Sequence, residues 1–556
     1  MSQVNIIDLV PKAVRQQWIN DGTYPNQSVY TIFCQHAQQF PHKPAVLSLD
    51  ETITYEQLLD KVNRLAQGLK TLGISPGDVV AYQLCNSWRS CAIDLAVAAL
   101  GAVVAPFPPG RGHLDIVALL RRCHACAIII EPKHGDTDLC QLITSFCSTL
   151  PSLHALIVDG PPREAWYTLS ALLQSEPIIS EQLPAVDPES PVRFLISSGT
   201  ESEPKLVAYS HNALIGGRGR FLQHVHPEGD SFRGMYLVPL GSAFGSTATF
   251  GVLSWLGGSL ILLPRFDVTS IIQAIQALRP THILGVPTMF QRIAADPTLE
   301  QADRASLFAI ISGGAMADPA TVERCQAAFN CDFISLYGSA DGVNCYTRFV
   351  AGDTTPNASC VGRPNPTVCA IRIVDAEGQE VVPGAIGEIT ARGSITPMQY
   401  VNAPELDDKY RDAEGWVYTG DLGYIDKAGH LVLAGRKKEI IIRGGANISP
   451  VQIEDIATSH PDVVSASCVP VPDPDLGHRI CLCLTTQEGR QRPSLPQMTR
   501  YLSEQGLEVN KLPEYLRYYR QLPLSPAGKV DKKQLAGEML FLQTPNHINP
   551  MEGVAS

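Results

Sequence analysis

Residues 193–211 hold the segment whose side chains are best suited to bind an anion. Two strand-like runs flank SSGTESEPK, a loop rich in hydroxyl groups that ends in Pro204 and Lys205. Backbone N–H groups, hydroxyls and an ammonium are the groups that a triphosphate needs. The loop is not a Walker A motif, because GxxxxGK[ST] is absent and no helix follows at once. Taken alone, such a loop is more often a solvated turn.

Four further segments combine glycines with charged or hydroxyl side chains. They are SLYGSADG (335–342), WVYTGDLGYID (416–426), GRKKEIIIRGGANISP (435–450) and PLSPAGKVDKK (523–533). Each of them alone is also compatible with a turn, a hairpin or a charged linker. Their order and separation, taken together with the hydroxyl-rich loop, indicate a common function.

The elements that must position these segments alternate between helix and strand from about residue 40 to 340. The stretch 54–73 has apolar residues at alternating spacings of four and three, which predicts a helix with one apolar face. Thr54 and Gln57 form a capping box at its start, and Gly73 can end it. Short β-branched runs such as DVVAYQL, AIIIE, THILGV and FAIISG lie between helical stretches, which predicts layered, largely parallel sheets. Beyond about residue 435 the pattern is that of a small α+β unit.

Composition excludes several classes of protein. The chain has 556 residues and a net charge of −12, which argues against nucleic-acid binding. No run reaches the ~20 apolar residues of a membrane span, and the longest, 92–107 and 251–264, predict buried core. Fifteen cysteines without an export signal indicate reduced thiols in a cytoplasmic protein. Cys123 and Cys126 have the spacing of a dithiol or half a metal site, but buried thiols are the simpler interpretation.

The five segments resemble, in order and spacing, the core motifs of the adenylate-forming superfamily: acyl-CoA synthetases, stand-alone adenylation enzymes and luciferases. The style is closest to cyclohexanecarboxylate-type CoA ligases. The resemblance implies a large α/β N-terminal domain of layered, largely parallel sheets (1–434), a hinge (435–438) and a small mobile α+β C-terminal domain (439–556).

The resemblance also implies an activity. A carboxylic acid would react with ATP and Mg²⁺ to give acyl-AMP and pyrophosphate, and the acyl group would then pass to coenzyme A. The alternative acceptor is the phosphopantetheine of a carrier protein, loaded by a stand-alone adenylation enzyme that could even use an amino acid. A luciferase-like oxidase and a non-catalytic nucleotide-binding regulator are further alternatives. The oligomeric state stays open.

Site residues follow from the matched motifs. The nucleotide is expected to contact Ser198, Gly199, Thr200, Lys205, Gly313, Gly314, Ala315, Tyr337, Gly338, Asp421 and Arg436. Lys529 is expected to be catalytic, because a mobile ammonium can draw the carboxylate and the α-phosphate together and stabilise charge in the transition state. Lys438 matches the hinge, Gly444 and Gly445 the thiol tunnel, and Asp341 the position that assists Mg²⁺.

The acyl pocket is expected to consist of small or apolar residues. They are Ser242, Ala243, Phe244, Gly245, Met316 and Ser339. Gly245 stands where amino-acid-activating members have an Asp that pairs with the substrate ammonium, and Ala243 where salicylate-type members have an Asn. A buried ammonium without a partner is costly, although a carboxylate from elsewhere could replace that Asp. We therefore expect an uncharged aliphatic, alicyclic or lightly substituted aryl acid.

The match has three departures that could slow adenylation. Glu201 adds a carboxylate beside the expected phosphates, Ala340 lacks a hydroxyl, and Asp341 is one methylene shorter than the usual Glu. Asp421, Arg436 and Lys529 are intact, which argues against an inactive enzyme.

Overall fold

The computed structural model describes residues 4–111, 113–197, 205–227, 231–350, 359–437, 439–443, 446–473, 476–487, 489–490, 492–505, 507, 509–525 and 529–539. The chain divides into two compact units. Unit 1 comprises Met1–Pro356, Val361–Arg372 and Thr390–Thr419, and unit 2 comprises Asn357–Cys360, Ile373–Ile389 and Gly420–Ser556. Unit 2 thus includes residues that precede the hinge predicted at 435–438, and Lys438 itself lies outside the described residues.

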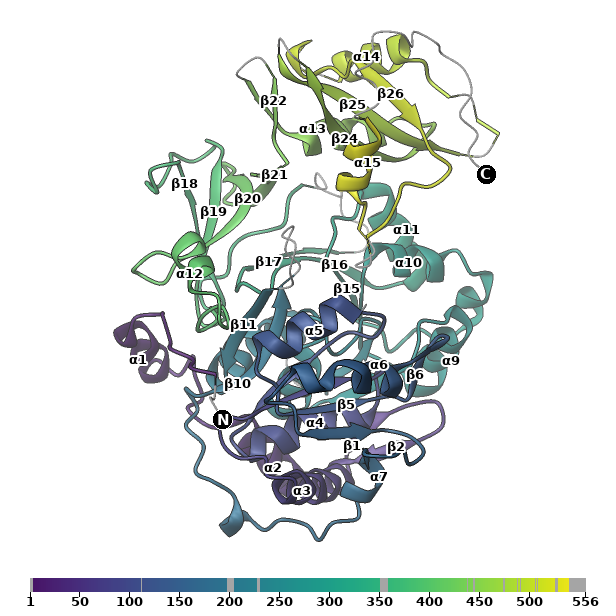
Figure 1. The fold of residues 1–556 in the computed structure, drawn as a ribbon. Coiled ribbons are helices and arrows are strands. Elements are labelled where there is room, and N and C mark those ends of the chain that lie inside the picture. The colour runs from purple at the N-terminus through teal and green to yellow at the C-terminus, as the bar shows by residue number, and fades with distance from the viewer. Residues whose placement is uncertain are drawn as a thin grey trace. The chain divides into compact units, whose positions relative to one another are not determined.

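Two sheets form the body of unit 1 (Figure 1). The first has the order β11-β10-β4-β3-β5-β8-β9, and its paired strands are parallel except for the β10–β11 hairpin. Its strands are β3 (Val79–Gln83), β4 (Val103–Pro106), β5 (Ala127–Ile130), β8 (Ala155–Val158), β9 (Tyr167–Thr168), β10 (Pro191–Ser197) and β11 (Lys205–Ser210).

The second sheet has the order β17-β16-β15-β14-β12-β13-β1-β2 and is antiparallel only at its two edges. Its strands are β1 (Pro44–Leu47), β2 (Thr52–Thr54), β12 (Arg233–Tyr236), β13 (Ser259–Leu262), β14 (His282–Gly285), β15 (Ala309–Gly313), β16 (Asp332–Gly338) and β17 (Asn344–Phe349). The apolar runs predicted as strands are therefore strands, and most are parallel.

Helices cover both faces of each sheet. Val80 and Tyr82 of β3 face a core shared with the second sheet, whereas Val79 and Ala81 face the opposite side, as the two-residue period of a strand requires. The helices in the shared core are α2 (Val29–Gln39), α3 (Tyr55–Thr71) and α4 (Trp88–Ala99). The outer helices are α5 (His113–Arg122) and α6 (Leu139–Phe146) on the first sheet, and α9 (Val268–Leu278), α10 (Pro287–Ala294) and α11 (Pro319–Phe329) on the second.

The remaining elements of unit 1 are shorter helices and one hairpin. They are α1 (Lys12–Asn20), α7 (Leu169–Leu172), α8 (Arg220–Val225), α12 (Pro404–Tyr410), the hairpin β6 (Lys133–His134) and β7 (Thr137–Asp138), three 3-10 helices, η1 (Cys147–Thr149), η2 (Ser180–Gln182) and η5 (Pro297–Gln301), and two π-helices, η3 (Ala213–Gly219) and η4 (Ala248–Trp255). Within the described residues, none of the helices combines the length and apolarity that crossing a membrane demands.

Local predictions about helix ends and thiols are confirmed. Helix α3 begins with the Thr54–Gln57 capping box, and Gly73 follows its end with φ +91°. Cys123 and Cys126 are buried free thiols, and burial raises the pKa of each to about 12.

Unit 2 contains the predicted small α+β arrangement. One sheet has the order β18-β19-β20-β21, and residues 370–372 of β18, 390–392 of β19 and 417–419 of β20 are assigned to unit 1. A second sheet, entirely in unit 2, has the order β23-β22-β25-β24 with β26 beside β25. The strands are β18 (Ala370–Val374), β19 (Gly387–Arg392), β20 (Val417–Ile425), β21 (Leu431–Arg436), β22 (Ile441–Arg443), β23 (Ala446–Ile448), β24 (Val463–Asp473), β25 (Gly477–Thr486) and β26 (Tyr515–Tyr518). Helices α13 (Pro450–Thr458) and α14 (Leu495–Glu504) share one core cluster with the second sheet, and α15 (Lys532–Met539) shares another.

Candidate functional site

Three predicted site segments leave parallel strands at the same edge of the second sheet, where β15 and β16 are neighbours and β14 separates β15 from β12. The chain runs from β12 into residues 237–245, from β15 into 314–316 and from β16 into 339–341. In open α/β sheets, ligands bind beyond the carboxyl ends of the strands. Two of these segments touch, because a Cβ built on Gly313 would lie 3.1 Å from Cε1 of Phe244.

The segment after β15 offers open backbone. Gly313 is buried, Gly314 and Ala315 are exposed, and Met316 is half-buried. Gly314 has φ +82°, a conformation that favours glycine. Tyr337, near the end of β16, is half-buried and pairs with Cys345 of β17.

The predicted acyl segment is held by hydrogen bonds within its own turn and by side chains from elsewhere, among them Asn86 and Arg218. Ser242 Oγ donates to the Pro239 carbonyl (2.7 Å) and accepts from the Gly245 N–H (3.0 Å). A Cβ on Gly245 would lie 2.0 Å from the Pro239 carbonyl oxygen, so this backbone has no room for a side chain there. Ala243 and Phe244 are partly exposed. An Asp at position 245 would therefore require the backbone to shift.

The turn that carries Ser339 and Asp341 is fixed by two tyrosines. The Asp341 N–H donates to Ser339 Oγ (3.1 Å), and the Tyr400 hydroxyl donates to Asp341 Oδ1 (2.8 Å). Burial, together with the negative charge of Asp341, raises the pKa of Tyr400, so the phenol stays protonated and can donate. Ala340 is buried, and its carbonyl accepts from the Tyr209 hydroxyl (2.8 Å).

Lys205 follows the loop that was predicted to hold phosphates. Ser197 and Lys205 pair across the β10–β11 hairpin, whereas Ser198, Gly199 and Thr200 lie outside the described residues. The buried Lys205 ammonium lies 4.2 Å from the ring centroid of Tyr410 and 5.9 Å from that of Tyr400. Tyr400 therefore contacts Asp341 and lies near Lys205.

In unit 2, three predicted residues lie close together. Asp421 on β20 and Arg436 on β21 are register partners, with Arg436 Nε 3.2 Å from Asp421 Oδ1. The Lys529 side chain as a whole is exposed. Partial burial of its ammonium, followed by the charge of Arg436, lowers the pKa of Lys529, and Asp421 and Glu439 oppose that shift.

Three carboxylates hold the segments that carry these residues. Glu388 accepts from the Gly420 N–H (3.1 Å) and from the Lys437 ammonium (2.7 Å), which fixes the ends of the β20–β21 hairpin. Three residues beyond Lys529, Lys532 lies 2.9 Å from Glu454 and 3.2 Å from a Glu439 oxygen. These ion pairs raise the pKa of Lys532 even though burial lowers it.

Sequence reasoning missed four residues that hold the site of unit 1: Tyr209, Arg218, Tyr400 and Tyr410. Tyr209 lies within the segment 193–211 but was not named there, and Arg218, Tyr400 and Tyr410 belong to no motif that was singled out. Only the folded chain brings these four side chains to the predicted residues. Lys438, Gly444 and Gly445 lie outside the described residues, so the hinge and the thiol tunnel stay predictions.

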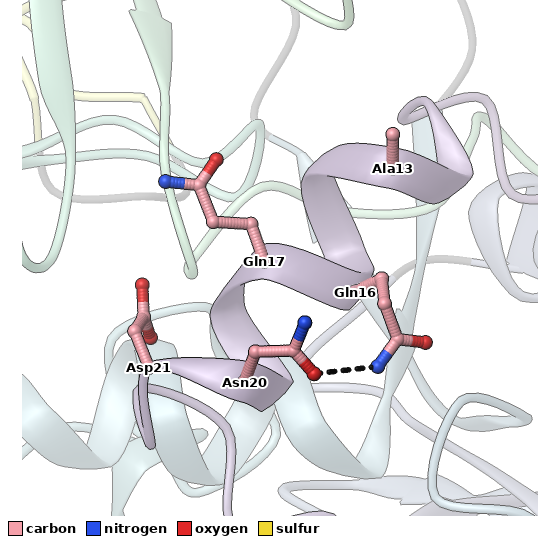
Figure 2. Close-up of a pocket in the computed structure, with 5 residues that line it drawn as sticks. All are labelled: Ala13, Gln16, Gln17, Asn20 and Asp21. Atoms are coloured by element: carbon pink, nitrogen blue, oxygen red, sulfur yellow. Dashed lines mark hydrogen bonds between the residues drawn. The ribbon is translucent and has the colours of Figure 1, made fainter.

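A surface hollow lies elsewhere, on α1. Its lining residues are Ala13, Gln16, Gln17, Asn20 and Asp21, and Gln16 Nε2 donates to Asn20 Oδ1 (3.0 Å), as Figure 2 shows. None of the predicted site residues contributes to it, so it has no part in the candidate site.

Comparison with known proteins identifies the family. Residues 33–401 match the AMP-binding enzyme family, and the chain belongs to this family. The resemblance inferred from the five motifs is thereby confirmed, as is the fold.

Individual relatives cover nearly the whole chain. A salicylyl-CoA synthase / salicylate adenylyltransferase of Streptomyces sp is 30% identical over 539 residues, 94% of this chain and 96% of that protein. A fatty acid–[acyl-carrier-protein] ligase, ScoC, of Streptomyces coeruleorubidus is 28% identical over 511 residues, 90% and 94% of the two chains. The solved structure of the amide bond synthetase McbA from Marinactinospora thermotolerans has a TM-score of 0.80 at 26% identity and covers 92% of this chain and 99% of its own.

Proposed function

We propose that this chain uses ATP to convert a carboxylic acid to its acyl-adenylate, releases pyrophosphate, and transfers the acyl group to a thiol, with coenzyme A the first candidate. A carboxylate is a poor electrophile because its leaving group would be oxide, and adenylation supplies AMP as a better one. The observation that carries the proposal is the cluster of Asp421, Arg436 and Lys529 in a chain of the AMP-binding family. We place the reaction in the cytoplasm, where ATP and coenzyme A are available.

Nucleotide binding is assigned to both units. In unit 1, Tyr337 would lie along the adenine, residues 313–315 and 338 would line the nucleotide, and Lys205 with residues 198–200 would bind phosphates. In unit 2, Asp421 would accept hydrogen bonds from the ribose hydroxyls, as a carboxylate can. Arg436, already paired with Asp421, would reach ribose or phosphate.

The residues around Asp341 fit a magnesium ion that arrives with ATP. Mg²⁺ is usually bound by one or two carboxylates together with substrate phosphates and waters. Asp341 supplies one carboxylate, which Tyr400 orients, and the described residues include no cluster of three or more metal-ligating side chains. When bound, Mg²⁺ would neutralise phosphate charge.

Lys529 is assigned the catalytic role in the first half-reaction. Its ammonium would stabilise the charge that grows between carboxylate and α-phosphate, and losing such a group costs on the order of 10²–10³ in rate. Lys529→Ala should therefore abolish most acyl-AMP formation but leave ATP binding nearly intact. Lys533→Ala, an exposed lysine four residues along, is the matched control. Full adenylation by Lys529→Ala would remove the assigned role.

The substrate class follows from the acyl segment. Ala243, Phe244, Met316 and Ser339 would line a pocket for an uncharged acyl group, and the backbone at Gly245 leaves no room for the Asp that an amino acid would need. One relative is named for salicylate, but Ala243 lacks the amide that would bind its ortho-hydroxyl. Aliphatic, alicyclic and lightly substituted aryl acids therefore come first.

The acyl acceptor is the least constrained part of the proposal. Relatives are named for coenzyme A and for an acyl carrier protein, and a structural neighbour for amide bond synthesis. Transfer would involve rotation of a C-terminal domain (439–556) about 435–438, with Lys438 as the pivot. That motion would bring Gly444 and Gly445 to the incoming pantetheine arm.

The deciding experiment is acid-dependent pyrophosphate release with MgATP over a panel of fatty, alicyclic, aryl and amino acids. Each acid is tested alone, with coenzyme A, with a phosphopantetheinylated carrier protein and with a simple amine. Multiple turnovers with coenzyme A would support the main proposal, and acceleration only by the carrier protein would favour the alternative acceptor. No pyrophosphate with any acid would refute the proposed function.

A further inference from the structure

Arg218 links two predicted parts of the site that come from different strands. Its guanidinium donates to the Ala243 carbonyl (3.2 Å) in the acyl segment and to the Ser339 carbonyl (2.8 Å) in the turn that leads to Asp341. It also donates to the Tyr209 hydroxyl (2.9 Å), and Tyr209 in turn donates to the Ala340 carbonyl. The Arg218 side chain thus connects the segment expected to bind the acid with the turn that carries Asp341.

Burying the charged Arg218 guanidinium costs folding free energy, so a contribution to stability does not explain why an arginine is found here. Only 7% of Arg218 is exposed, and its partners are neutral: three oxygens and the Tyr209 ring, whose centroid lies 4.7 Å from the guanidinium carbon. Among the described residues it has no carboxylate at ion-pairing distance, and its buried Nε–H has no hydrogen-bond partner. Burying a charge without a counter-charge is unfavourable, and a core arginine of the same chain, Arg193, has Asp94 as its partner.

The helix that carries Arg218 packs closely against its neighbours. The π-helix η3 has glycines on both sides of Arg218, and π-helical turns are frequent at functional sites. A Cβ on Gly217 would lie 2.5 Å from Ile395 Cα, and one on Gly219 would lie 3.1 Å from the Trp255 ring. Because the glycines allow this close approach, η3 packs tightly against Ile395 and Trp255. This packing defines the backbone position from which the Arg218 side chain extends.

We propose that Arg218 is a positioning residue for adenylation, which sets the acid-binding segment at Ala243 in register with the turn of Ser339 and Asp341. The inference rests on the proposed function. Bonds that a planar guanidinium makes in fixed directions suit this role better than the flexible point charge of lysine. A misplacement of about 1 Å in such a site can cost roughly 10²-fold in rate.

The test compares Arg218→Met with Arg220→Met in the pyrophosphate assay, with the best acid found for the wild type. Arg220 is the matched control, because it likewise donates three hydrogen bonds, in its case to the backbone carbonyls of Gly22, Thr23 and Gly216, away from the site. We expect Arg218→Met to lower kcat about 10²-fold while the KM for ATP changes less than about threefold. Arg220→Met should keep kcat within about threefold of the wild type.

Further variants keep the inference refutable if Arg218→Met does not fold. Arg218→Lys keeps the positive charge but loses the planar guanidinium with its fixed N–H directions. Tyr209→Phe keeps the ring and removes the hydroxyl. Each should lower kcat by at least about tenfold in protein that is folded at the assay temperature. Wild-type kcat in Arg218→Lys, or equal losses in Arg218→Met and Arg220→Met, would overturn the inference and leave the proposed function standing. A wild-type protein inactive with every acid would overturn both.

Discussion

The ion pair between Asp94 and Arg193 makes unit 1 sensitive to the loss of either partner alone. Asp94 is 0% and Arg193 1% exposed, and the guanidinium Nη1 lies 3.0 Å from Asp94 Oδ2. Thr249 (2.7 Å) and Tyr82 (3.2 Å) also donate to the carboxylate, and Arg193 donates to the Leu240 carbonyl (2.6 Å). The pair joins α4 to β10 in the core between the two sheets.

Arg193→Met should cost about 3–5 kcal/mol, because removing one partner leaves a buried charge uncompensated. The hydroxyls of Thr249 and Tyr82 stay in place, so they do not add to the loss, whereas the Leu240 carbonyl loses its donor. The double variant Asp94→Leu/Arg193→Met should regain at least about 2 kcal/mol over Arg193→Met, because no charge then remains buried.

Native-state hydrogen exchange at the amides of β3, β4 and β10 measures this free energy within unit 1 and needs no two-state unfolding of the whole chain. Asp94→Leu completes the double-mutant cycle. A loss below about 1 kcal/mol in Arg193→Met, or strictly additive losses in the double variant, would refute the reasoning that the pair stabilises the core through charge compensation.

Three further perturbations test other parts of the structure. Tyr400→Phe removes the hydroxyl that orients Asp341, and a hydrogen bond to a charged group is worth about 1.5–3 kcal/mol, so the Mg²⁺ concentration for half-maximal pyrophosphate release should rise roughly tenfold; an unchanged Mg²⁺ dependence would contradict this. Gly245→Asp should lower the melting temperature without creating amino-acid-dependent pyrophosphate release, because its Cβ would lie 2.0 Å from the Pro239 oxygen; a stable variant that activates amino acids would disprove it. Burial lowers the pKa of His211 and His282 to about 3 from 6.5, so below pH 6.5 the unfolded chain binds more protons and the unfolding free energy falls as the pH drops toward 3. His282→Phe should flatten that slope in denaturant titrations at a series of pH values, and an equal slope would count against the assignment.

Much of the fold was predictable because its signals are local. The capping box at Thr54 and the β-branched runs identify helix α3 and the parallel strands from neighbouring residues alone. The division into units was not predictable in the same way. Ile373–Ile389 belongs to unit 2, although the large unit resumes after it, and only long-range contacts determine such membership.

The site was predictable where a motif carries it and not where packing completes it. Asp421, Arg436 and Lys529 lie on three separate segments, and their motifs predicted a common site. The structure brings the three residues close together, and their roles stay predictions. Arg218 and Tyr400 contact the predicted residues only through tertiary structure, and no spacing in the sequence relates them to Ser339 or Asp341. The sequence shows only that Gly245 lacks the carboxylate of an Asp. The fold shows in addition that the Pro239 backbone approaches Gly245 so closely that only glycine fits.

The interleaved course of the chain through the two units also bears on its synthesis. During translation, Ile373–Ile389 of unit 2 leaves the ribosome before Thr390–Thr419 of unit 1. That late segment includes Tyr400 and Asp407. Tyr400 pairs with Val207 of β11, and Asp407 accepts a hydrogen bond from the Tyr400 N–H. Unit 1 therefore cannot complete its fold until Thr390–Thr419 has been synthesised, and by then Ile373–Ile389 of unit 2 has already emerged. Nascent chains halted near residue 390 should therefore be open to protease at β10 and β11, and those halted beyond 450 should be protected there.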